Sequence, residues 1–201
     1  MNLTELERDA LAEVLNVGVG QAANALSQLS GHEVMLSVPV VHMMTKGAIA
    51  EQLGQHGADR VCAVRQEFAG ALSTEAVLMF PVQQSLQLVQ MMVGSDVPLE
   101  QLGEMEQEAL GEIGNILLNA VVSSMADLLK LSFEGSLPQV ELGQVGEVLC
   151  AQEQADALLL SLQIDFQIEA LQVTGFLAFL LDVASVAALK AKVVAFLDSA
   201  T

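Results

Sequence analysis

The sequence has no tryptophan or tyrosine and few basic residues, with seven lysines and arginines against 25 aspartates and glutamates. The formal net charge of −18 would repel a nucleic-acid backbone, because binding to phosphates depends on their neutralisation by basic side chains. The missing aromatic residues also remove two of the side chains on which bases usually stack. We therefore expect no nucleic-acid partner.

Cysteine and histidine are also scarce, and they show no spacing typical of a metal or redox site. Cys62 and Cys150 are far apart and belong to no CxxC motif, and the three histidines lack the pairing of metal ligands on a helix. No Ser, His and Asp set appears in a recognisable nucleophile-elbow context, and there is no glycine-rich phosphate loop. The sequence predicts buried, reduced thiols and no cofactor of its own, and it disfavours an enzyme with its own enclosed pocket.

Long apolar runs are missing as well, although the mean hydropathy is +0.52. The longest apolar stretch, Ala170 to Leu181, is bounded by Glu169 and Asp182. It is shorter than the roughly 20 residues that a membrane-spanning helix needs. Residues 1–9 are acidic where a secretory signal has basic and then apolar residues. We expect no membrane insertion and a cytoplasmic location.

A repeat organises the chain. Residues 5–41 and 104–140, aligned without gaps at an offset of 99, share the same residue at ten positions. A match of this kind indicates an internal duplication. The shared residues include Glu5 with Glu104, Ala10 with Ala109, Leu11 with Leu110, Glu13 with Glu112, Asn16 with Asn115, Leu29 with Leu128 and Pro39 with Pro138.

Each half is expected to open with a long helix, continue with strands and close with a second helix. The expected strands are residues 33–42, 60–68 and 72–80, then 134–140, 157–168 and 171–181, with closing helices at 82–93 and 183–197. This order predicts a pseudo-symmetric α+β fold with long helices packed on a largely antiparallel β-sheet. No Pro- or Ser-rich linker separates the halves, so we expect one domain, 1–201, made of two repeats at about 1–99 and 100–201.

Both long helices present a carboxylate and an amide on the face opposite the apolar one. On a helical wheel the apolar side of the first helix holds Leu11, Val14, Leu15, Ala22, Ala25, Leu26 and Leu29. The outward residues are Asp9, Glu13, Asn16 and Gly20 in the first copy and Glu108, Glu112, Asn115 and Asn119 in the second.

Glu and Asn are ordinary on a solvated helix face, so one copy alone would need no function. Asparagine inside a helix costs roughly 0.5 kcal/mol or more against alanine, so its retention in both diverged copies favours a function over shared ancestry alone.

The chemistry of this pair suits phosphoryl transfer to water. An asparagine amide donates and accepts hydrogen bonds at once, so it can hold a water in line with a phosphorus atom without becoming a nucleophile. A glutamate one turn earlier offers a fixed negative charge to a cation of the partner. No strong general base is evident nearby, which fits a loose transition state that depends on positioning. Because an exposed convex helix cannot enclose a small molecule, we expect a phosphoprotein substrate.

The segment Asp9-Ala-Leu-Ala-Glu13-Val-Leu-Asn16, with Pro39 after 22 further residues, resembles the signature of the CheC/CheX/FliY family of chemotaxis response-regulator phosphatases. That signature has Asp or Ser, three residues, Glu, two residues, Asn and, 22 residues later, Pro. The second copy consists of Glu108, Glu112, Asn115 and Pro138, and it departs from the signature only in its first residue. The resemblance covers nearly the whole chain, and the two motif copies make it most like CheC.

The resemblance implies dephosphorylation of the phosphoaspartate of a CheY-like response regulator in bacterial chemotaxis signalling. In such a site Asn16 and Asn115 would orient the attacking water, Glu13 and Glu112 would pair with a receiver-domain lysine, and the receiver would bring its own Mg²⁺. Some members bind the deamidase CheD, for which no residue here is decisive. With no further domain after Thr201, we expect no flagellar-switch extension of the kind that FliY carries.

Two alternatives remain open. A non-catalytic adaptor would bind receiver-domain or flagellar-switch proteins through the same surface, although retention of both asparagines favours catalysis. A duplicated structural domain used for dimerisation would be favoured if both outward faces were buried against another chain.

Overall fold

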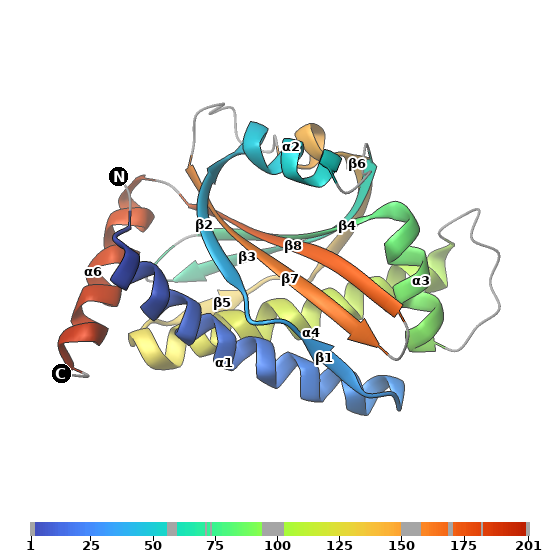
Figure 1. Cartoon of the computed structure of the whole chain (residues 1–201), viewed down its shortest axis with the longest axis horizontal. Coiled ribbons are helices and arrows are strands. Elements are labelled where there is room, and N and C mark those ends of the chain that lie inside the picture. The colour runs from blue at the N-terminus through green and yellow to red at the C-terminus, as the bar shows by residue number, and fades with distance from the viewer. Residues whose placement is uncertain are drawn as a thin grey trace.

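The computed structural model describes residues 3–55, 60–70, 72, 74–93, 103–149, 158–168, 171–181 and 183–199. Two long helices, α1 and α4, lie side by side against one face of a curved sheet, and α2 lies over the other face (Figure 1). In chain order the elements are α1 (Glu5–Ser30), β1 (Val34–Leu36), β2 (Val40–Thr45), α2 (Lys46–Gln55), β3 (Arg60–Gly70), β4 (Thr74–Pro81), α3 (Val82–Val93), α4 (Glu104–Leu129), β5 (Phe133–Gly135), β6 (Gln139–Gln144), α5 (Val145–Val148), β7 (Leu158–Ile168), β8 (Leu171–Leu181) and α6 (Val183–Ser199).

The strands form an 8-stranded sheet in the described part of the chain, and its neighbouring strands are antiparallel. The order is β1-β7-β8-β4-β3-β5, with β2 also paired to β7 and β6 also paired to β3. The strands that follow α1 therefore pair with β7 of the second half, and those that follow α4 pair with β3 of the first half. The predicted α+β class with an antiparallel sheet is confirmed.

The element order repeats along the chain. The bounds of α1 and α4 differ by 99 residues at both ends, and the same offset separates β1 from β5 and β2 from β6. The order of strands across the sheet is also symmetric, because the outermost strands of each edge come from the opposite half. The helices and strands therefore repeat at the same offset of 99 residues as the sequence does.

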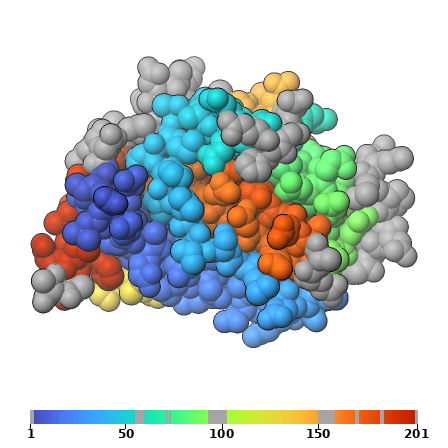
Figure 2. Space-filling model, viewed as in Figure 1, coloured from blue at the N-terminus to red at the C-terminus, as the bar shows by residue number. Residues whose placement is uncertain are grey.

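Apolar side chains are buried on both faces of the sheet. Along β7, Leu160 and Leu162 are fully buried on the face toward α1 and α4, as the alternation of side chains in a strand requires. Leu159 points to the other face, where it meets Ile49 and Leu53 of α2. Parts of β7 and β8 reach the surface, with β1 on one side and α3 on the other (Figure 2).

Some expectations from the sequence are wrong. The strands expected at 33–42 and 134–140 are each divided in two, with residues 37–39 and 136–138 between the parts. The helices α2 and α5 were not expected. Leu29 is 52% exposed instead of buried, because Leu26 makes the core contact in the last turn of α1. The strand β1 packs on the side of the helix that holds Ser27, whose hydroxyl accepts from the Val34 N–H at 2.9 Å.

By length and composition α4 could cross a membrane, and no other helix in the described ranges passes this test. Its apolar residues have a place within the fold, however. Leu110, Leu117 and Val121 are fully buried, and the helix packs against α1 and the sheet. The composition of α4 is therefore that of a core helix.

Candidate functional site

The first motif lies in the first half of α1. Thr4 begins this helix with a capping box, in which its hydroxyl accepts from the Glu7 N–H at 3.2 Å and the Glu7 carboxylate accepts from the Thr4 N–H at 2.7 Å. Asp9 and Glu13 are exposed, and Asn16 is half-buried. The helix thus presents the carboxylate and the amide outward, one turn apart, as the sequence predicts.

The second motif has the same arrangement on α4. Glu108 and Glu112 are exposed, and Asn115 is half-buried. No side chain caps the start of this helix at Gly103, but Glu104 and Glu106 lie in its first turn, where negative charge offsets the helix dipole.

Two glycines let α4 approach its neighbours closely. A Cβ atom on Gly18 of α1 would lie 2.6 Å from the carbonyl oxygen of Ala120 and 2.6 Å from the Cα of Val121. A Cβ on Gly114 would overlap the side chain of Val64 on β3. Ordinary carbon contacts are about 3.5–4.0 Å, so any larger residue at either position would push α4 away.

The motif prolines lie in two matching bulges of the sheet. Residues 37–39 and 136–138 each place three residues opposite two on the partner strand, since Leu36 and Val40 pair with Phe166 and Gln163 in the first copy. Gly135 and Gln139 pair with Phe68 and Arg65 in the second copy. Such bulges bend a strand and redirect its side chains, and they tolerate proline.

A serine fixes each bulge with the same pair of hydrogen bonds. In the first copy the Asp165 N–H donates to the Ser37 hydroxyl and the Ser37 N–H donates to the Asp165 carbonyl, both at 2.9 Å. In the second copy the Glu67 N–H donates to the Ser136 hydroxyl at 3.1 Å, and the Ser136 N–H donates to the Glu67 carbonyl at 2.9 Å. Sequence reasoning missed both serines, although each stands two residues before its motif proline.

The second motif borders a hollow of about 550 Å³, which we call the acidic hollow. It is lined by Glu104, Gln107, Glu108, Gly111, Glu112, Leu137, Pro138 and Val140. The surface here is therefore not purely convex, in contrast to the expectation from the sequence. Carboxylates face an apolar wall made by Leu137, Pro138 and Val140, an arrangement that suits the methylenes and the charge of a basic side chain.

An additional amide contacts the asparagine of the second motif. The Asn119 Nδ2 donates to the Asn115 side-chain Oδ1 at 2.6 Å and to the Asn115 backbone carbonyl at 2.8 Å. Gln66 of β3, only 2% exposed, places its Nε2 at 3.5 Å from the Asn119 Oδ1 and donates to the Ser136 carbonyl at 2.8 Å. We call these three residues the amide chain.

The first copy has no such chain. Gly20 occupies the position of Asn119, and a Cβ there would meet nothing within 4 Å. No side chain in the described ranges hydrogen-bonds to the Asn16 amide. On β3, Gln66 lies between Arg65 and Phe68, which pair with the residues at the two ends of the second bulge. The equivalent residue opposite the first bulge is Ile164 on β7, whose side chain is buried.

Exposed apolar side chains flank both motifs at equivalent positions. Leu6 is 64% exposed and its counterpart Met105 is 70% exposed, each three residues before the first motif carboxylate. Val38 is 64% exposed and its counterpart Leu137 is 86% exposed, each directly before the motif proline. Large apolar residues in contact with water at matched positions favour a protein-binding surface.

The cysteine that the structure describes lies in the hydrophobic core. Cys62 is a buried free thiol, and burial raises its pKa to about 12, so it is neutral at physiological pH. Cys150 is outside the described residues. Within the described ranges no group of three or more His, Cys, Asp or Glu residues could hold a metal ion.

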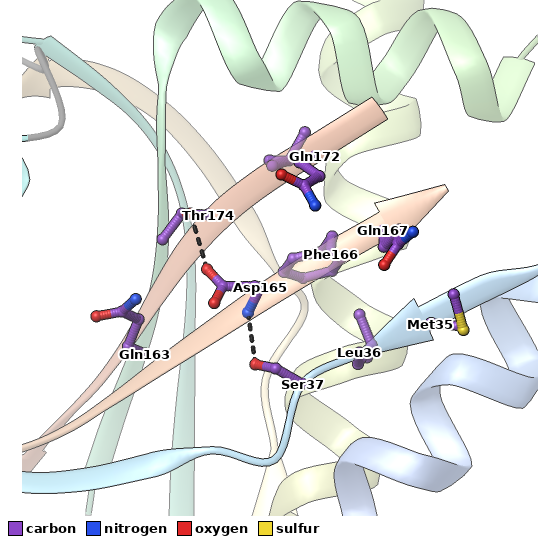
Figure 3. Close-up of a pocket in the computed structure, with 10 residues that line it drawn as sticks. Met35, Leu36, Ser37, Gln163, Asp165, Phe166, Gln167, Gln172 and Thr174 are labelled. Atoms are coloured by element: carbon purple, nitrogen blue, oxygen red, sulfur yellow. Dashed lines mark hydrogen bonds between the residues drawn. The ribbon is translucent and has the colours of Figure 1, made fainter. Parts of the chain in front are cut away.

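A second hollow, of about 520 Å³, lies on β1, β7 and β8 (Figure 3). Asp165 occupies its middle, where its Oδ1 accepts from the Thr174 hydroxyl at 2.8 Å and its backbone N–H binds Ser37. Among the described residues that line this hollow, Asp165 has the only charged side chain. Neither motif asparagine lines the hollow, and the hydrogen bond between Asp165 and Ser37 fixes the bulge of the first copy.

Comparison with known proteins identifies relatives of this chain. The sequence model of the CheC-like family matches residues 6–43, which include the first motif from Asp9 to Pro39. Over 151 residues the chain is 32% identical to the CheY-P phosphatase CheC of Bacillus subtilis (strain 168), and the match covers 73% of this chain and 71% of that protein. This chain belongs to the CheC-like family. It is also 26% identical over 148 residues to the flagellar motor switch phosphatase FliY of the same organism, covering 73% of this chain but 38% of that protein.

Solved structures share the fold. FliY of Thermotoga maritima matches with a TM-score of 0.79 at 21% identity, over 98% of this chain and all (100%) of that one. A chain of the FliM–SpeE complex from H. pylori matches with a TM-score of 0.73 at 10% identity, over 95% of this chain and 96% of that one. At these identities the likeness shows the architecture and does not transfer an activity.

Proposed function

We propose that this CheC-like protein dephosphorylates the phosphoaspartate of a CheY-like receiver domain. The observation that carries the proposal is the duplicated Glu and Asn pair, which faces outward from both long helices of a chain related to a CheY-P phosphatase. Asn16 and Asn115 orient the attacking water, and Glu13 and Glu112 bind the receiver. The protein acts in the cytoplasm, where such receivers signal.

The reaction needs little from this chain beyond positioning. The water oxygen bonds to phosphorus while the bond from phosphorus to the aspartate carboxylate oxygen breaks, which yields inorganic phosphate and the free carboxylate. The loose transition state gains most from alignment of the water and from charge stabilisation. The receiver supplies the Mg²⁺ that neutralises the phosphoryl oxygens, and the asparagine amide from this chain completes the site.

The surface around the motifs supports a protein partner. The acidic hollow brings Glu108 and Glu112 next to Leu137, so a lysine of the receiver can pack its methylenes on the apolar wall while its ammonium pairs with a carboxylate. The net charge of −18 favours association with a partner whose contact surface is basic.

A non-catalytic adaptor is the second candidate, and one specific observation favours it. The fold is shared with a chain of the FliM–SpeE complex, and a fold of this kind can serve several functions. In an adaptor the same outward faces would bind a receiver or a flagellar-switch protein without turnover. The retained asparagines then would contribute to binding alone.

Phosphate release distinguishes the two candidates. A receiver domain phosphorylated beforehand is mixed with wild type, Asn16→Ala, Asn115→Ala or the double variant in the presence of Mg²⁺. Acceleration that is lost only in the double variant supports a two-site phosphatase. Asn24→Ala is the control, because Asn24 is an exposed asparagine of α1 outside the motif, and it should retain full activity. Binding of the phosphorylated receiver without acceleration by wild type would favour the adaptor.

A further inference from the structure

We infer that Asn119 and Gln66 are positioning residues of the second site, which hold the Asn115 amide in one orientation, and that the first site lacks this support. As a statement about catalysis the inference rests on the proposed function. As a statement about the amide it rests only on the hydrogen bonds of the amide chain.

Two backbone carbonyls determine which way the side-chain amides of Gln66 and Asn119 are turned. A carbonyl oxygen can only accept, so Gln66 must turn its NH₂ group toward the Ser136 carbonyl, at 2.8 Å. Asn119 likewise must turn its NH₂ group toward the Asn115 carbonyl, at 2.8 Å. The Asn119 Oδ1 then faces the Gln66 NH₂ group, at 3.5 Å, as the donor and acceptor pattern requires.

Gln66, at the buried end of the amide chain, shows that its side-chain amide can take only one orientation. The Gln66 Oε1 is a buried oxygen without a hydrogen-bond partner in the described structure. Turning the Gln66 amide over would not remedy this, because its oxygen would then face the Ser136 carbonyl and the Asn119 Oδ1, which are both acceptors. The observed orientation is therefore the only one that gives both of those oxygens a donor.

The orientation of the Asn119 amide in turn determines the orientation of the Asn115 amide. The Asn119 NH₂ group donates to the Asn115 Oδ1 at 2.6 Å, so the oxygen of Asn115 is held against its own helix. Both N–H bonds of Asn115 remain free of partners in the described residues. In the phosphatase the Asn115 NH₂ group is thus the one that meets the water, and the water oxygen keeps a lone pair for phosphorus.

The first copy is built without these contacts. Gly20 has no side chain to donate to Asn16, and Ile164 has no polar atom at the register position of Gln66. The Asn16 amide is still mobile in the complex and must be ordered when the water is aligned in the transition state, and this loses side-chain entropy that Asn115 has already lost on folding. Loss of the Asn119 contact should lower kcat of the second site by about three- to tenfold, as fixing one rotamer-rich side chain suggests.

A reciprocal exchange tests the kinetic part. Asn119→Ala is placed in an Asn16→Ala background, where only the second site works, and kcat should fall while KM for the phosphorylated receiver stays constant. Gly20→Asn is placed in an Asn115→Ala background, where only the first site works, and kcat should rise, with Gly20→Ala as its control. Unchanged kcat in both exchanges, or a change confined to KM, would overturn the inference.

A measurement without activity separates this inference from the proposed function. Side-chain NH₂ signals of uniformly ¹⁵N-labelled protein are assigned by their loss in Asn16→Asp and Asn115→Asp. The Asn115 NH₂ group should be restricted on the picosecond to nanosecond timescale, and the Asn16 group mobile; Asn119→Ala should make Asn115 as mobile as Asn16. Equal mobility of both groups in the wild type would refute positioning by Asn119. Restricted Asn115 in a protein without phosphatase activity would refute the proposed function and leave the positioning intact.

Discussion

Replacing Gly18 by alanine should destabilise the protein, whereas the same change at Gly20, two residues later, should stabilise it. The Cβ added at Gly18 would lie 2.6 Å from backbone atoms of Ala120 and Val121, which cannot rotate away as a side chain can. The Cβ added at Gly20 would meet nothing within 4 Å. Both substitutions add the same methyl group to the same helix, so the difference between them isolates the contact of α1 with α4.

The magnitudes follow from two opposing effects. Alanine stabilises the interior of a helix by up to about 1 kcal/mol over glycine, whereas overpacking of a core costs about 1–3 kcal/mol. We expect Gly20→Ala to raise the free energy of unfolding by about 0.5–1 kcal/mol and Gly18→Ala to lower it by about 1–2 kcal/mol. Urea unfolding followed by circular dichroism measures both, with the m value as a check that the two-state transition is retained. A Gly18→Ala variant at least as stable as Gly20→Ala would refute the close approach of the two helices.

Three further predictions concern the partner surface, pH and the thiol. Leu137→Asp, at a side chain 86% exposed, should leave stability within about 0.5 kcal/mol and weaken receiver binding about tenfold in titration calorimetry, while Val194→Asp on α6 should leave binding unchanged. Hydrogen bonding to the Thr4 N–H holds the pKa of Glu7 below its ordinary value of 4.5. The ionised Glu7 therefore stabilises the folded protein near neutral pH, and this stabilisation is lost as pH falls through the lowered pKa. Glu7→Gln should lose less stability than the wild type between about pH 5 and pH 3 in urea titrations. Because burial raises the pKa of Cys62 to about 12, its reaction with a disulfide reagent should be slow in the folded protein and fast in urea, and equal rates would contradict its burial.

The parts of the fold that the sequence predicts well are those determined by local patterns. The closing helix of the first half, Val82–Val93, and the strand Leu171–Leu181 have the expected bounds. Both are continuous in sequence, and Pro81 directly precedes the helix while Asp182 directly follows the strand. The two long helices could be matched to each other because the repeat supplies a second copy of the same amphipathic pattern.

The division of the strands could not be predicted because it depends on distant contacts. Ser37 bonds to Asp165, 128 residues later, and Ser136 bonds to Glu67, 69 residues earlier. No local property of residues 33–42 indicates that residues 37–39 form a bulge opposite two residues of β7, a strand from the other half. The same holds for Gln66, which reads as an ordinary strand residue and meets Asn119 only because α4 packs against β3.

Each site therefore draws on both halves of the chain. The second motif lies on α4 and beside β6, but Gln66 and Val64 behind it belong to β3 of the first half. The bulge of the first motif is fixed in turn by Asp165 on β7 of the second half. A substitution in the strands of one half can thus change the contacts of the motif in the other half, so the two motifs can differ in their surroundings while both are kept. The exchange of strands also means that neither half can form its own site alone, because the strands on which β1 and β2, or β5 and β6, pair would be missing.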